Sequence, residues 1–86
     1  MTFDQWIDAV NTSVHARLGE TVRTQELSWD SALWSSRDNT VVAALGMDEQ
    51  TAKFTFDGGE HLTVAFRDEA AAPDTIGATV AEHLGR

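Results

Sequence analysis

The first hydrophobic pattern in the chain has the period of an α-helix. Apolar side chains recur every three or four residues along its first stretch: Phe3, Trp6, Ile7, Val10, Val14 and Leu18. They form a one-sided stripe, which is typical of a helix packed on a core. Thr2 and Gln5 fit a capping box at the start, and Gly19 can end the helix. The pattern predicts a helix over about residues 3–18.

Alternation of apolar and polar positions replaces this period in the middle of the chain and predicts strands. Residues 26–30 alternate, and the strand is expected to continue into 31–36 unless that stretch forms a helical turn. After the turn-forming residues at 35–40, residues 40–47 are apolar on both faces, as in a central strand. Residues 52–56 and 61–67 alternate again and predict two further strands.

The tail of the chain returns to helical spacing. Pro73 and Asp74 suit a first helical turn, and an apolar stripe follows that runs to about residue 84, made of Ile76, Val80 and Leu84. Gly77 permits another backbone to approach closely. Short connections favour an antiparallel meander, and both helices must bury their stripes on one face of it. We therefore predict one α+β domain over residues 1–86, a two-layer sandwich in which N- and C-terminal helices flank a four-stranded antiparallel meander (α-β-β-β-β-α).

The stretch "FDGGEH" joins the last two predicted strands. A two-residue loop would put their apolar sets on opposite faces, whereas a loop of Asp57, Gly58 and Gly59 pairs Phe54 with Leu62 and places both on the core face. The expected core-face set is Phe54, Phe56, Leu62, Val64 and Phe66. A phosphate loop is excluded because no helix follows, and adjacent strand residues such as Glu60 and His61 point to opposite faces. The stretch is therefore interpreted as a turn, with no metal bound.

Composition narrows the class of partner. Fourteen acidic residues stand against six Lys and Arg, so the net charge is −8, and there is no cysteine. Bare nucleic acid and anionic membranes are disfavoured, because both are bound through basic side chains. A basic protein surface is the natural complement, although acidity can also serve solubility or reflect a salt-adapted habitat. The N-terminus does not resemble a signal peptide, so a cytoplasmic location is expected.

The sequence contains no motif that is typical of a catalytic site. The histidines, His15, His61 and His83, lack metal-binding spacing, and no serine lies in a nucleophile-elbow context. We therefore expect no catalytic residues, no cofactor and no enzymatic activity.

The predicted meander gathers acidic residues at one end of the sheet. The turn at Asp48 and Glu49 and the chain exit at Asp68 and Glu69 are expected at the same end, with Asp74 close by. Glu20 and Glu26 are expected there too, only partly offset by the basic residues Arg23, Lys53 and Arg67. Adjacent strands are about 4.8 Å apart, so these carboxylates are expected roughly 5–12 Å from one another. A partner-binding surface is the prediction; a divalent-cation site or merely solvated turns are the alternatives.

The tryptophans suggest a second candidate surface. Trp6 and Trp29 fall on the expected core faces, but Trp34 is out of phase with Trp29 and would point away from the helices. There it would share an open face with Val42 and Ala44, while Val41, Ala43, Leu45 and Met47 face inward. Exposed aromatic surface often marks a partner site. The alternative is that Trp34 lies in a turn and folds over an edge.

The function favoured by these features is a non-catalytic acidic protein-binding module. It would be an inhibitor or antagonist of a basic nucleic-acid-binding protein or complex, such as a phage-encoded anti-defence protein or a DNA mimic. One alternative is a chaperone or immunity protein that masks a toxin or effector with the open face. A small enzyme or ligand-binding subunit is the other. The sequence does not decide between a monomer and a homodimer.

Overall fold

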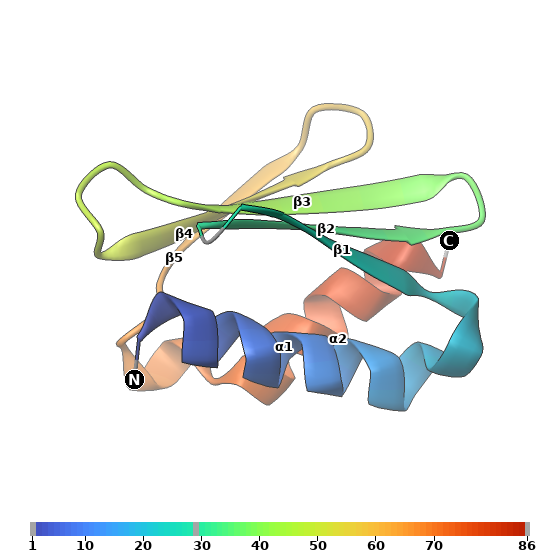
Figure 1. Cartoon of the computed structure of the whole chain (residues 1–86), viewed down its shortest axis with the longest axis horizontal. Helices are drawn as coiled ribbons and strands as arrows, with labels where there is room; N and C mark the ends of the chain where they lie inside the picture. The colour runs from blue at the N-terminus through green and yellow to red at the C-terminus, as the bar shows by residue number, and fades with distance from the viewer. Residues whose placement is uncertain (1, 29, 86) are drawn as a thin grey trace.

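Two helices lie side by side on one face of a five-stranded antiparallel sheet (Figure 1). This computed structural model describes residues 2–28 and 30–85. The strands follow one another in the sheet in chain order, β1-β2-β3-β4-β5. The elements are α1 (Phe3–Leu18), η1 (Gly19–Thr21), β1 (Arg23–Ser28), β2 (Ser31–Ser36), β3 (Asn39–Leu45), β4 (Thr51–Phe56), β5 (His61–Ala65), η2 (Glu69–Ala71) and α2 (Pro73–Leu84). The predicted two-layer α+β meander with flanking helices is confirmed, although it has five strands where four were predicted.

Both helices begin and end as the sequence signals indicate. The Thr2 hydroxyl accepts a hydrogen bond from the Gln5 backbone N–H at 3.2 Å, and the Gln5 side chain accepts one from the Thr2 N–H at 3.0 Å. This is the predicted capping box. Pro73 occupies the first turn of α2. The two helices approach closely at Gly77, where an added Cβ would lie 2.5 Å from the Ser13 Cβ, so only glycine fits there.

The extra strand arises from a chain reversal between Ser28 and Ser31. The Ser28 hydroxyl hydrogen-bonds the Asp30 carboxylate and lies 3.0 Å from the Ser31 hydroxyl, and the pairing of β1 with β2 shifts register here. Short polar side chains that bond to one another locally favour such a turn. The predicted single strand from residue 26 onward was therefore wrong: it is a hairpin, and residues 31–36 form a strand and not a helical turn.

This hairpin reverses the orientation expected for Trp34. With β2 as a separate strand, Ala32, Trp34 and Ser36 face the helices and are buried. The Trp34 ring stacks on Phe54 at 6.2 Å between centroids, and its indole N–H donates to the Asn11 side-chain oxygen at 2.8 Å. The prediction of an exposed Trp34 on the open face was wrong. Trp29 lies outside the described residues.

The hairpin of β4 and β5 has the predicted register. Phe54 pairs with Leu62, Ala52 pairs with Val64, and the Phe56 N–H donates to the Glu60 carbonyl at 2.9 Å. The loop therefore contains three residues, and both of its glycines adopt a φ of 87°. Positive φ is readily available only to glycine, which explains the glycine pair. The core-face set is confirmed: Phe54, Phe56 and Phe66 are buried, and Leu62 and Val64 pack half-buried against the core.

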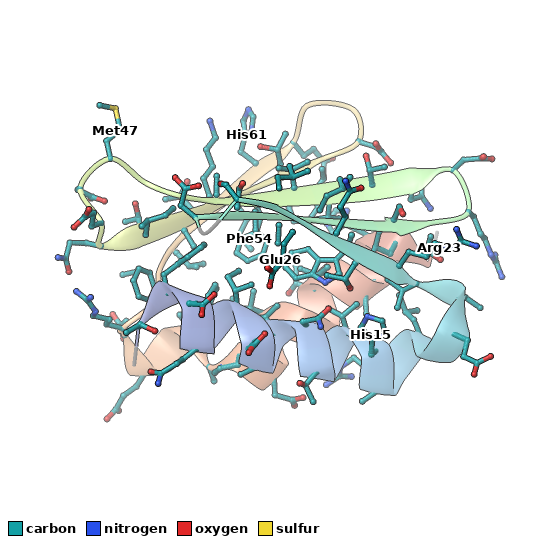
Figure 2. The ribbon with its side chains drawn as sticks, viewed as in Figure 1. His15, Arg23, Glu26, Met47, Phe54 and His61 are labelled. Carbon is teal, nitrogen blue, oxygen red and sulfur yellow. The ribbon has the colours of Figure 1, made fainter. Side chains whose placement is uncertain are left out.

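The hydrophobic core fills the space between the sheet and the helices. Figure 2 shows Phe54 pointing into this space from β4. Its neighbours include Trp6 of α1, which is buried as predicted and donates its indole N–H to the Ala71 carbonyl at 2.9 Å. Val41 and Ala43 also face inward as predicted. Leu45 is only half-buried, and Met47 is fully exposed because β3 ends before it, so that expectation was wrong for Met47 (Figure 2).

Candidate functional site

Arg67 brings two acidic segments together at one end of the sheet. Its guanidinium donates to the Gln50 side-chain oxygen at 3.1 Å, linking the end of β5 to the turn between β3 and β4. Two surface hollows, of about 200 and 440 Å³, adjoin here, and both are lined by Phe66 and Arg67. Figure 1 shows this turn, the end of β5 and the start of α1 at the same end of the molecule. We call this region the acidic end, made of Asp4, Asp48, Glu49, Asp68 and Glu69.

Asp48 is held by its own turn. Its carboxylate accepts hydrogen bonds from the Gln50 N–H at 3.0 Å, the Thr51 N–H at 3.3 Å and the Thr51 hydroxyl at 3.1 Å. These bonds favour the charged form. The hydrogen bond from the Gln50 N–H is the main reason that the pKa of Asp48 lies below its ordinary value of 3.8. The hydrogen bonds from Thr51 lower this pKa further. Asp48 therefore contributes charge to the acidic end while its side chain shapes the turn.

The hydrogen bonds of Asp48 predict a measurable titration. Because its folded-state pKa is lowered, its stabilising contribution is present above pH 3.8 and is lost as the pH falls through the folded value. Carboxyl-carbon NMR should show an Asp48 midpoint below 3.8. Thr51→Val removes only the hydroxyl donor, so it should raise the Asp48 midpoint part of the way toward 3.8. A wild-type midpoint at or above 3.8 would contradict the turn geometry.

Glu49 lies in the same turn, and its carboxylate forms no hydrogen bond or ion pair with another described residue. Its backbone has a φ of 58° and its N–H donates to the Gly46 carbonyl at 3.0 Å, which closes the turn. The residue is exposed, and it lines the smaller hollow together with Thr2 and Asp4 from the start of α1. Asp4 was not predicted as part of this surface. The sequence could have indicated this position for Asp4, because an N-terminal helix that packs along a meander begins near one of the turns of the sheet.

The second acidic pair leaves the sheet after β5. Asp68 and Glu69 are exposed, and both line the larger hollow beside Arg67. The Asp68 N–H donates to the Ala65 carbonyl at 2.8 Å, and the Asp68 carbonyl accepts from the Ala71 N–H at 3.0 Å. These backbone bonds fix the short connection into η2. The structure therefore places all four predicted turn residues, Asp48, Glu49, Asp68 and Glu69, at one end.

Asp74 has a different role from the one its position suggested. Its carboxylate accepts a hydrogen bond from the Ser13 hydroxyl at 2.9 Å and forms an ion pair with Arg17 at 3.2 Å. Asp74 thus ties α2 to α1 and does not line either hollow of the acidic end. Glu20 also lies elsewhere, because β1 starts opposite Ser35, next to the β2–β3 turn at the other end of the sheet. Glu26 lies within β1, where it pairs with Ala32, and not in a connection at the acidic end.

The open face of the sheet is modest in its apolar content. Without Trp34 it keeps Val42 and Ala44, both half-buried, and Val42 lies between Leu33 and Thr55 in the register. Their neighbours include polar residues such as Ser31, Lys53 and Thr63. Leu27, on the edge strand β1, is 52% exposed. Among residues 2–28 and 30–85, this face therefore offers scattered aliphatic groups and no exposed Phe or Trp.

Other chemistry-bearing residues make structural contacts. Asp57 accepts hydrogen bonds from the Thr40 N–H at 2.7 Å and the Thr40 hydroxyl at 2.8 Å, which joins the β4–β5 turn to β3. The His83 ring stacks on the Phe56 ring with 4.0 Å between their centroids, and the His15 ring is hydrogen-bonded to the Thr24 hydroxyl at 2.8 Å.

Within residues 2–28 and 30–85, no three His, Asp or Glu side chains are placed to hold a metal ion. In that same part of the chain, no helix is long and apolar enough to cross a membrane.

Comparisons with known proteins found no relative of this chain. No protein-family model, curated protein or solved structure matches the chain.

Proposed function

We propose that this chain is a non-catalytic, cytoplasmic protein-binding module that uses its acidic end to engage a basic protein surface. The observation that carries the proposal is the gathering of Asp4, Asp48, Glu49, Asp68 and Glu69 from three segments around a single described guanidinium, that of Arg67. Complementary charge governs the encounter rate and orientation of such partners. The net charge of −8 supports a basic partner and disfavours direct binding to nucleic acid or anionic membranes.

The spacing of the carboxylates favours a nucleic-acid-binding protein as the partner. The acidic residues come from neighbouring segments, and adjacent strands lie about 4.8 Å apart, so we expect separations between the charges on the scale of those between backbone phosphates. Such a surface can occupy a groove that normally holds DNA or RNA. We propose that the protein acts as an inhibitor or antagonist of that partner, of the phage-encoded or anti-defence type. The alternative open-face chaperone is less well supported, because Trp34 is buried.

Competition with nucleic acid tests this proposal. Immobilised protein is used to capture basic proteins from the source host, and each captured protein is then titrated with duplex DNA or structured RNA. We expect the nucleic acid and the present protein to exclude each other, because they would occupy the same groove. A stable ternary complex, or capture only of proteins without nucleic-acid affinity, would contradict the antagonist proposal.

A further inference from the structure

A second hollow, with the opposite charge, lies at the other end of the sheet. Its volume is about 260 Å³, and it is lined by Thr21, Arg23, Ser35, Ser36 and Arg37. Arg23 pairs with Ser35 across β1 and β2, and Arg37 follows Ser36 in the turn to β3. Figure 2 shows the Arg23 side chain at this end, close to the β2–β3 turn. We call this hollow the arginine hollow.

The cations of the arginine hollow are not neutralised by neighbouring described groups. Both Arg23 and Arg37 are exposed, and among residues 2–28 and 30–85 no carboxylate lies within ion-pair distance of either one. The acids next to the hollow in sequence, Glu20 and Asp38, do not line it. This contrasts with Arg17, whose charge is taken up by Asp74. Two guanidiniums therefore border one hollow in a strongly acidic protein.

The remaining wall supplies hydroxyl groups. Ser35 is half-buried and can donate toward the hollow, whereas the Thr21 hydroxyl already donates to the Leu18 carbonyl at 2.8 Å. Arg37 has a φ of 56° in a two-residue turn, a conformation that Asn and Gly adopt more readily. The turn geometry thus accepts an arginine at a position where a smaller residue would suit the backbone better.

We propose that the arginine hollow binds a phosphate group. Guanidinium forks bond phosphate oxygens in pairs, and these charge-assisted bonds are stronger than neutral ones. The Ser35 hydroxyl can add a further, uncharged hydrogen-bond donor. A volume of about 260 Å³ is below the roughly 300–1,000 Å³ of sites that enclose drug-sized ligands, so the hollow suits the phosphate itself. The ligand is free phosphate or the phosphate of a small monoester.

Amide NMR of the whole chain with inorganic phosphate at constant ionic strength tests the site. We expect saturable shifts centred on residues 21–23 and 35–37, with much weaker effects from acetate. Arg37→Asn removes the guanidinium but keeps a residue that tolerates positive φ, and Arg23→Gln removes the other. Each should weaken phosphate binding by about tenfold or more, since each removes a charge-assisted partner.

Lys53→Gln is the matched control, because it removes one exposed positive charge that does not line the arginine hollow. It should leave the phosphate titration unchanged. A parallel titration with adenosine monophosphate separates the two sources: tighter binding than phosphate identifies a monoester ligand, and weaker binding identifies the free anion. Shifts that never saturate, or that Lys53→Gln reduces as much as Arg37→Asn does, would overturn the proposal.

Discussion

Replacing Phe54 by alanine is expected to lower the free energy of unfolding by about 3–5 kcal/mol. The ring is fully buried between the two layers, with the Trp6 ring 5.9 Å away edge-on and the Trp34 ring stacked at 6.2 Å. Alanine would leave a cavity among these rigid rings, which cannot collapse easily to fill it. Small domains are stable by only about 5–15 kcal/mol, so this single change should remove a large share of the total.

Urea denaturation followed by tryptophan fluorescence measures this effect. Thr55→Ala is the control, because Thr55 is the next residue in β4 and points to the opposite face of the sheet. It should change stability by less than about 1 kcal/mol. If Phe54→Ala does not fold, Phe54→Leu should still fold with a loss of about 1–2 kcal/mol. An unchanged denaturation midpoint for Phe54→Ala would contradict the register of β4.

Local signals were sufficient to predict the two helices and the last hairpin. The Thr2–Gln5 capping box and the position of Pro73 are short-range features, so the helix starts could be read directly. The register of β4 and β5 followed from one requirement, that Phe54 and Leu62 share a face, which only an odd-numbered loop allows. In each case the deciding interaction lies within a few residues of the chain.

The β1–β2 hairpin could not be predicted in the same way. Its turn contains no Gly or Pro, and the bonds among Ser28, Asp30 and Ser31 are visible only once the chain has folded back. Missing one reversal changed the orientation of every later residue in that strand. Trp34 was therefore placed on the open face, although its ring is in the core and its indole N–H is satisfied by Asn11 on α1.

The candidate site was predicted in part because of how a meander alternates. The turn at Asp48 and Glu49 and the exit at Asp68 and Glu69 are separated by two strands, so they return to the same end whatever precedes them. Glu20 precedes β1, so the end of the sheet where it lies depends on the number of strands between it and the β3–β4 turn, and it was misplaced when one strand was missed. The bonds of Asp74 to Ser13 and Arg17 could not be predicted, because they are contacts between distant segments of the chain.

Reversing the charge of Glu49 and Glu69 together is expected to weaken partner binding by roughly 10- to 100-fold. Both residues are exposed, and neither carboxylate forms a hydrogen bond or ion pair with another described residue. Glu49→Lys with Glu69→Lys should therefore change the free energy of unfolding by less than about 1 kcal/mol. Asp48 and Asp74 are left in place, because their carboxylates hold the β3–β4 turn and the two helices.

The matched control reverses two acids at the other end of the sheet. Glu20→Lys with Glu60→Lys changes the net charge by the same amount, and both residues are exposed. If net charge alone attracts the partner, both double variants weaken binding equally. If the acidic end is the recognition surface, only Glu49→Lys with Glu69→Lys has the large effect.

The most direct test is the dissociation constant of the captured partner for these two double variants across a range of salt concentrations. For the wild type, binding should weaken as salt rises, because the screening length falls from about 8 Å at physiological ionic strength to about 3 Å at 1 M. Glu49→Lys with Glu69→Lys should bind weakly at every salt concentration, and the Glu20 and Glu60 control should follow the wild type. Affinity that survives both high salt and the substitutions at Glu49 and Glu69 would contradict recognition through the acidic end.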